Sequence, residues 1–173
     1  MAKINSTPYP TTEQNTEKIK LIRLRPYHPT WVIAFFAEGG LNNGNNRIGF
    51  NRVIQAINDN PDIEVEFVGC YDDICIHCES LHASSIDSVW GRRQTCSSAE
   101  NPVVVAEVTE ANRQILNLLG LQFGAIISLK ELVPLMRDRL PDIDKSGIKQ
   151  IGGAGLQGKY EKGLQTISAH LHI

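Results

Sequence analysis

The sequence lacks a long apolar run. The longest one, residues 31–36 (Trp-Val-Ile-Ala-Phe-Phe), is much shorter than the roughly 18 residues that a membrane-spanning helix needs. Residues 1–16 are rich in Ser, Thr, Asn and Pro, and they contain no apolar core of a secretory signal. We therefore expect a cytoplasmic protein that has no membrane partner.

An excess of charge is also absent. The 17 basic residues are balanced by 19 acidic ones, which gives a formal net charge of −2. A protein that binds nucleic acid usually concentrates Lys and Arg in one patch, so we expect no nucleic-acid partner. A small anionic ligand and association of identical chains both stay open.

Cysteine is sparse as well. Four cysteines in 173 residues are too few for a disulfide-stabilised scaffold, and thiols in a reducing compartment serve as ligands or catalysts. Three of the four nevertheless lie in one stretch, residues 70–78 (Cys-Tyr-Asp-Asp-Ile-Cys-Ile-His-Cys). The sequence therefore predicts that soft-metal or thiol chemistry is concentrated there.

Within this stretch, Cys75 and Cys78 form a Cys-x-x-Cys pair, whose short loop can place two sulfur atoms on one ion. Zinc, iron–sulfur and dithiol redox sites all use this spacing. Cys96, near the end of a long polar loop predicted over residues 79–101, and His28, between two prolines, would complete a Cys3His set. We predict that these four residues bind zinc or an iron–sulfur cluster.

Other functions of these residues stay open. Cys96 can instead be a buried small residue, His28 a turn residue, and Cys70 a core residue. Asp72 and Asp73 either cap the turn by bonding backbone amides, or support a metal ligand through a hydrogen bond, or, together with His28, transfer protons as catalytic groups. Negative neighbours disfavour a strongly activated thiolate, because they raise the pKa of a thiol.

Further polar residues lie at other places in the chain. Arg23 and Arg25 alternate with leucines, so they either bind an anionic cofactor or substrate, or form a solvated sheet face. His170 and His172 have the spacing of a two-histidine metal grip on a strand, or belong to a frayed terminus. If they bind a metal in this way, the two histidines would stand in for ligands that the cysteines do not supply.

The predicted fold is a single α+β (or small α/β) domain over residues 18–173, preceded by a disordered arm over residues 1–17. Strands are predicted at 18–25, with Ile19 as one candidate for burial, and at 64–68. About four helices are predicted, at 30–37 with Thr30 as its cap, 47–59, 103–119, and 128–140 with Ser128 as its cap. The two strands should be neighbours in a βαβ-like unit.

Residues 23–28 (Arg-Leu-Arg-Pro-Tyr-His) after the first strand and residues 72–78 (Asp-Asp-Ile-Cys-Ile-His-Cys) together resemble a bacterial and archaeal family. It is catalogued as domain of unknown function 1284, and the resemblance covers most of residues 20–165. The family's cysteines imply a metal or iron–sulfur site, with no settled activity. His28, Asp72, Asp73, Cys75 and Cys78 match its motifs, and Cys96 matches its middle cysteine.

Three of the six cysteines that the family pattern implies are replaced here. Trp31 stands at one position, and residues 151–154 (Ile-Gly-Gly-Ala) stand where a late Cys-x-x-Cys is expected, while Tyr27 replaces a histidine. The predicted function is a metal-binding protein of unknown activity. The alternatives are a small enzyme that uses Cys75 or Cys78 with His28, and a metal-free interaction module.

Overall fold

The structure is a computed structural model that describes residues 18–42, 47–69, 71–75, 106–148, 151 and 155–173, and the backbone alone of residues 81–87, 92–96 and 102–105. The predicted arm over residues 1–17 lies outside these ranges. So do Cys70, His77, Cys78 and the side chain of Cys96.

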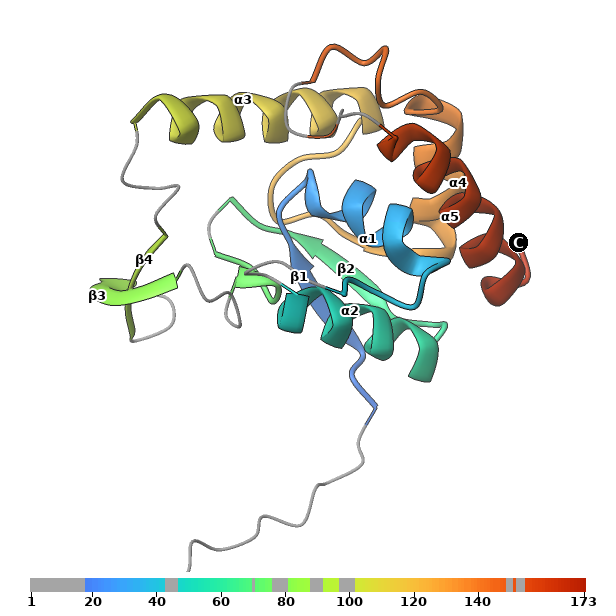
Figure 1. Cartoon of the computed structure of the whole chain (residues 1–173), viewed down its shortest axis with the longest axis horizontal. Helices are drawn as coiled ribbons and strands as arrows, with labels where there is room; N and C mark the ends of the chain where they lie inside the picture. The colour runs from blue at the N-terminus through green and yellow to red at the C-terminus, as the bar shows by residue number, and fades with distance from the viewer. Residues whose placement is uncertain are drawn as a thin grey trace, which may run out of the picture.

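A mixed three-stranded sheet lies at the centre of the fold (Figure 1). Its order is β1 (Leu21–Leu24), β2 (Glu64–Phe67), β5 (Ile126–Ser128), with β1 parallel to β2 and β5 antiparallel to it. Alternate residues of β1 and β2 are buried, which is the pattern of strands that have one face on the core. The parallel pairing of β1 and β2 confirms the predicted neighbouring strands.

Five helices belong to the described part of the chain, and together with the sheet they give the predicted α+β fold. They are α1 (His28–Phe36), α2 (Arg47–Asp59), α3 (Pro102–Leu119), α4 (Leu129–Arg139) and α5 (Leu156–Leu171). Three of them confirm predicted helices almost to the residue, because periodic apolar side chains and clear end signals define α2, α3 and α4. Among the described residues, no helix is long and apolar enough to cross a bilayer.

Helix α4 begins with one of these end signals, a capping box. The hydroxyl of Ser128 accepts a hydrogen bond from the Glu131 amide, and the Glu131 carboxylate accepts one from the Ser128 amide. This reciprocal capping box satisfies two amides that the helix itself cannot bond. The cap predicted at Ser128 is therefore confirmed.

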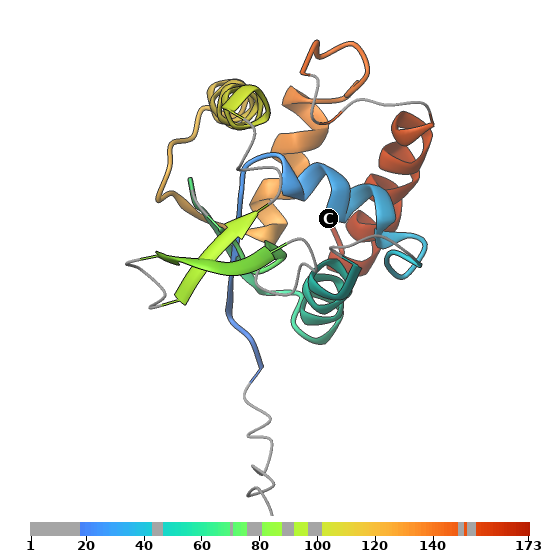
Figure 2. The ribbon, with the colours of Figure 1, turned by 60° about the vertical axis from the view of Figure 1, so that its left-hand side comes forward.

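Helices α1 and α5 lie side by side on the core (Figure 2). A Cβ atom at Gly163 would lie only 1.8 Å from the carbonyl oxygen of Ile33, so the two backbones can approach this closely only because residue 163 is glycine. Tyr160, Leu164, Ile167 and Leu171 are buried on the same helix. Their spacing is that of an apolar helical face.

The structure corrects several predictions near the chain's glycines and prolines. Helix α1 begins at His28 rather than at Thr30, because a proline at the first turn needs no amide partner, and the Thr30 hydroxyl donates to the carbonyl of Tyr27 at 2.6 Å. The tail is helix α5, with His172 as its left-handed cap, so His170 and His172 are not on a strand. Ile19, expected to be buried, precedes β1 and is 51% exposed.

The loop predicted over residues 79–101 is wrong for much of its length. It contains β3 (Leu81–Asp87) and β4 (Arg92–Cys96), which pair antiparallel with Leu81 opposite Cys96. Polar side chains do not prevent backbone pairing, and the ladder satisfies amides and carbonyls that a long loop would leave to solvent.

We expect substitution of two glycines on α5 to have opposite effects. Gly163→Ala should lower the free energy of unfolding by about 1–3 kcal/mol, because its Cβ overlaps the backbone of α1. Gly158→Ala, which meets no atom within 4 Å, should raise it by about 0.5–1 kcal/mol through helix propensity. Urea unfolding of both variants measures the contrast, and equal effects would contradict the close packing of α1 on α5.

Candidate functional site

The candidate site lies where the chain leaves β1 and where residues 71–75 run beside that strand. The Asp73 carboxylate accepts a hydrogen bond from the Arg23 amide at 2.7 Å, and the Asp73 amide donates to the Arg23 carbonyl at 3.1 Å. The Asp72 carboxylate accepts one from the Arg25 amide at 2.7 Å. Two acidic residues thus occupy the edge of β1 that faces away from β2.

Asp72 joins this edge to two side chains of the predicted site. Its Oδ2 atom contacts Nδ1 of His28, and its Oδ1 atom accepts a hydrogen bond from the Cys75 amide at 3.0 Å. Asp72 is 0% exposed and His28 is 4% exposed, so solvent does not compete for these contacts. The turn-capping role predicted for Asp72 is confirmed, and the same carboxylate also orients the imidazole.

The environment favours an ionised Asp72 and a neutral His28. Burial opposes the charge on Asp72, but His28, the Arg25 guanidinium and the Arg25 amide hold the pKa of this carboxyl well below its usual range. Burial lowers the pKa of His28. An ionised carboxylate can only accept, so Nδ1 of His28 carries the hydrogen and Nε2 carries the lone pair.

Cys75 lies on the other side of Asp72. Its side chain is 5% exposed, and its Sγ accepts a hydrogen bond from Nη2 of Arg25 at 2.7 Å. Burial and the charge of Asp72 raise the pKa of the Cys75 thiol to about 12, although Arg25 opposes this shift. Without a bound cation the group is therefore a thiol, and a coordinated metal ion would remove its proton.

Residues that the sequence analysis did not single out form the walls of this site. The side-chain oxygen of Asn112 on α3 accepts a hydrogen bond from the Tyr27 amide at 3.3 Å, and Asn112 is only 3% exposed. Gly49 on α2 lies so close to residues 71–75 that an added Cβ would be 2.2 Å from the Ile74 carbonyl oxygen. In the sequence, the only sign that Asn112 belongs to the site is that a polar side chain stands among the apolar positions of α3.

The structure brings four of the predicted residues together: His28, Asp72, Cys75 and Arg25. Arg23 instead pairs with Glu66 at 2.8 Å. Nε2 of His170 lies 3.3 Å from the Ile57 carbonyl oxygen, a contact between α5 and α2.

Within the described ranges, no three His, Cys, Asp or Glu side chains are grouped so that they could hold a metal ion. Cys78 and the side chain of Cys96 lie outside those ranges. The predicted four-ligand set therefore stays a prediction, of which the structure describes the two members His28 and Cys75.

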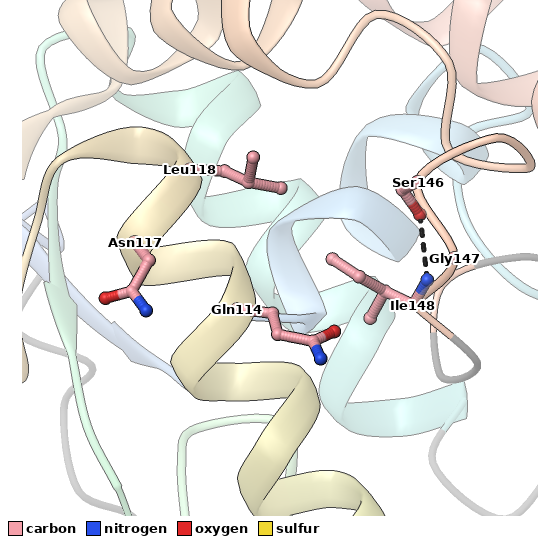
Figure 3. Close-up of a pocket in the computed structure, with 6 residues that line it drawn as sticks. All are labelled: Gln114, Asn117, Leu118, Ser146, Gly147 and Ile148. Carbon is pink, nitrogen blue, oxygen red and sulfur yellow. Dashed lines mark hydrogen bonds between the residues drawn. The ribbon is translucent and has the colours of Figure 1, made fainter.

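A shallow cavity of about 400 Å³ lies elsewhere, between the C-terminal end of α3 and residues 146–148 (Figure 3). In it, Ser146 Oγ accepts a hydrogen bond from the Ile148 amide at 3.1 Å. The residues that line it are Gln114, Asn117, Leu118, Ser146, Gly147 and Ile148. None of them is a predicted site residue, so the cavity adds no group to the cluster around Asp72.

Comparisons with known proteins give no relative for this chain: no family model, no curated protein and no solved structure matches it. The resemblance to the family of unknown function therefore stays a prediction.

Asp72 should matter much more for stability than its neighbour Asp73. Asp72→Asn should lower the free energy of unfolding by about 3–5 kcal/mol, because an amide NH2 group cannot accept the bonds that the Arg25 amide and His28 donate to Oδ2 of the carboxylate. Asp73→Asn, the matched control, keeps an oxygen that can accept from the Arg23 amide and should cost about 1 kcal/mol. Urea unfolding at neutral pH measures both.

The same comparison has a defined pH dependence. Because the folded pKa of Asp72 is depressed, its stabilising contribution is present above the unfolded pKa of about 3.9 and is lost as the pH falls through the folded value. The stability difference between wild type and Asp72→Asn should therefore shrink below about pH 4. A difference that stays constant down to pH 2 would contradict the ionised state of Asp72.

Proposed function

We propose that the protein binds a metal through cysteine and histidine ligands, as zinc or as an iron–sulfur cluster, around His28 and Cys75. The observation that carries this proposal is that Asp72 has two roles. It contacts His28 Nδ1, and it accepts a hydrogen bond from the Cys75 amide. Histidines that ligate metals commonly donate their other ring N–H to a carboxylate, which fixes the tautomer and the ring. The arrangement thus prepares His28 Nε2 as a ligand.

The residues of the described cluster suit such a group in their chemistry. Imidazole nitrogen and thiolate sulfur are the donors that zinc and iron–sulfur sites use. Burial lowers the pKa of His28 and so favours the neutral ring that binds a metal, whereas Cys75 must release its proton to solvent on binding. Metal binding should therefore weaken as the pH falls.

Cys78 and Cys96 are the proposed remaining ligands. Backbone pairing supports Cys96, because it lies opposite Leu81, only three residues beyond Cys78 in the chain. Three extended residues span at most about 11 Å. The pairing with Leu81 therefore limits the distance between the backbone of Cys96 and the Cys-x-x-Cys pair. The resemblance of residues 72–78 to the family motif supports the same set. Thiolate ligands must stay reduced, so a reducing compartment such as the cytoplasm is part of the proposal.

Elemental analysis of protein purified without air tests the proposal directly. The expected result is about one equivalent of zinc, or iron with matching sulfide, because such sites bind tightly at neutral pH. A double Cys75→Ala, Cys78→Ala variant should lose it, whereas Cys70→Ala, the matched cysteine control, should keep it. Less than about a tenth of an equivalent in the wild type would refute metal binding and favour a metal-free interaction module.

A small enzyme is the second candidate function. The contact between Asp72 and His28 is also the arrangement in which a carboxylate orients a general acid or base. The raised pKa of Cys75 weighs against that thiol as a nucleophile, so in this alternative His28 acts beside a metal ion or on a substrate.

Substitution of His28 distinguishes a ligand from an acid–base group. His28→Ala should destabilise the fold in either case, because it leaves the buried Asp72 without its partner, so metal per folded protein is the deciding measurement. A ligand role predicts loss of most of the metal, and an acid–base role predicts full retention. His170→Ala is the matched control and should retain the metal, because His170 contacts α2 rather than the cluster.

A further inference from the structure

The three-stranded sheet has two edges, and they differ in whether their backbone groups are bonded. The outer side of β1 is occupied by the carboxylates of Asp72 and Asp73, each of which accepts a hydrogen bond from an amide of that strand. The opposite edge is β5, whose one neighbouring strand among the described elements is β2. The outer side of β5 is therefore the edge to which a further strand can pair.

The pairing of β5 with β2 determines which of its backbone groups face outward. In an antiparallel pair, bonded residues alternate with residues whose amide and carbonyl point away from the partner strand. The Phe67 amide donates to the Ala125 carbonyl at 3.0 Å, and the next residue of the chain, Ile126, lies opposite Glu66. Ile126 therefore directs both its amide and its carbonyl away from β2, and so does Ser128.

Of these two residues, Ile126 is the one whose backbone groups are unused. The Ser128 amide donates to the Glu131 carboxylate at 3.3 Å, and its carbonyl, as part of a helix cap, belongs to the first turn of α4. No described group bonds the amide or the carbonyl of Ile126. A Cβ atom added at Gly124 would meet no atom within 4 Å, so the space beside this edge is open.

The surface around this edge is apolar and carries no charge. The side chains of Ile126 and Phe123 are 56% and 47% exposed. Residues 121–129 (Leu-Gln-Phe-Gly-Ala-Ile-Ile-Ser-Leu) include no acidic or basic residue, although proteins often place charges on a free sheet edge to prevent pairing. Two copies of the chain therefore meet no like charges within this segment, and a formal net charge of −2 adds little repulsion.

We propose that a second copy of this chain occupies this edge, with β5 antiparallel to its counterpart about a two-fold axis at Ile126. The amide of each Ile126 then donates to the carbonyl of the other, which makes the bonded type of antiparallel pair. The two side chains lie on one face of the combined sheet, with Cα atoms about 5.5 Å apart, and cover each other.

Self-complementarity favours a copy of the chain over a different partner. A two-fold interface requires that one surface patch fit itself, and here one residue supplies both the donor and the acceptor. A longer strand from another protein would gain no further hydrogen bond from β5, because Ser128 is already bonded. The paired copies would share one six-stranded sheet.

Sedimentation velocity over a range of protein concentrations tests the association. The interface is small, so we expect a midpoint of dimerisation of about 100 µM. Ile126→Lys should raise this midpoint at least about tenfold, because two like charges would face each other at the axis. Ile19→Lys is the matched control at a residue that is 51% exposed before β1, and it should dimerise like the wild type. Circular dichroism should show that both variants are folded.

Hydrogen exchange of the wild-type protein locates the interface without a substitution. The Ile126 amide should exchange about threefold more slowly at about 1 mM protein than at about 10 µM, whereas the Ile127 amide, which faces β2, should change much less. A wild-type protein that stays monomeric at 1 mM would overturn the proposal and leave the edge to residues 1–17 or to a different protein. A dimer that Ile126→Lys does not weaken, or in which Ile126 exchange is independent of concentration, would also overturn it.

Discussion

The buried carboxylate of Asp72 accepts hydrogen bonds or ionic contacts from three segments: the Arg25 amide at the end of β1, the His28 imidazole at the start of α1, and the Cys75 amide in its own turn. A carboxylate out of contact with water is stable only when its oxygens are fully bonded. The position of Asp72 therefore fixes how the first strand, the first helix and residues 71–75 fit together. The candidate site is a consequence of that requirement.

Two glycines let the surrounding helices reach this centre. Gly49 allows α2 to touch the backbone at Ile74, and Gly163 allows α5 to touch the backbone at Ile33 on α1. Side chains at either position would push a helix outward, and the rings of Tyr27 and Phe50 that contact His28 would shift with it. Close packing of this kind restricts the movement of the His28 ring.

Much of the fold follows from local signals in the sequence. The apolar periodicity of α2 and the capping box at Ser128 act within a few residues, and both predicted helices were correct. Helix α5 was missed because its glycines are typical of a loop, whereas Gly163 permits the close contact of this helix with α1. The strands β3 and β4 were missed because their side chains are mostly polar.

Only the local contacts of the site could be predicted from the sequence. The bond between Asp72 and the Cys75 amide is local, so a turn cap could be expected from the order of residues. The bond between Arg25 and Cys75 joins residues 50 positions apart, and it exists only because residues 71–75 dock beside β1 in one register. Asn112 meets Tyr27 for the same kind of reason, at a separation of 85 positions. Such contacts depend on tertiary packing, which no short motif encodes.

The position of the two acidic residues along β1 also bears on association between chains. A strand at the edge of a sheet usually presents free amides to which a strand of another molecule can pair. On this side the amides of Arg23 and Arg25 are already bonded to side-chain carboxylates, and one of these carboxylates is fully buried. A foreign strand could extend the sheet here only by displacing Asp72 from His28 and Cys75. Protection of the edge against aggregation and integrity of the candidate site therefore depend on the same carboxylate.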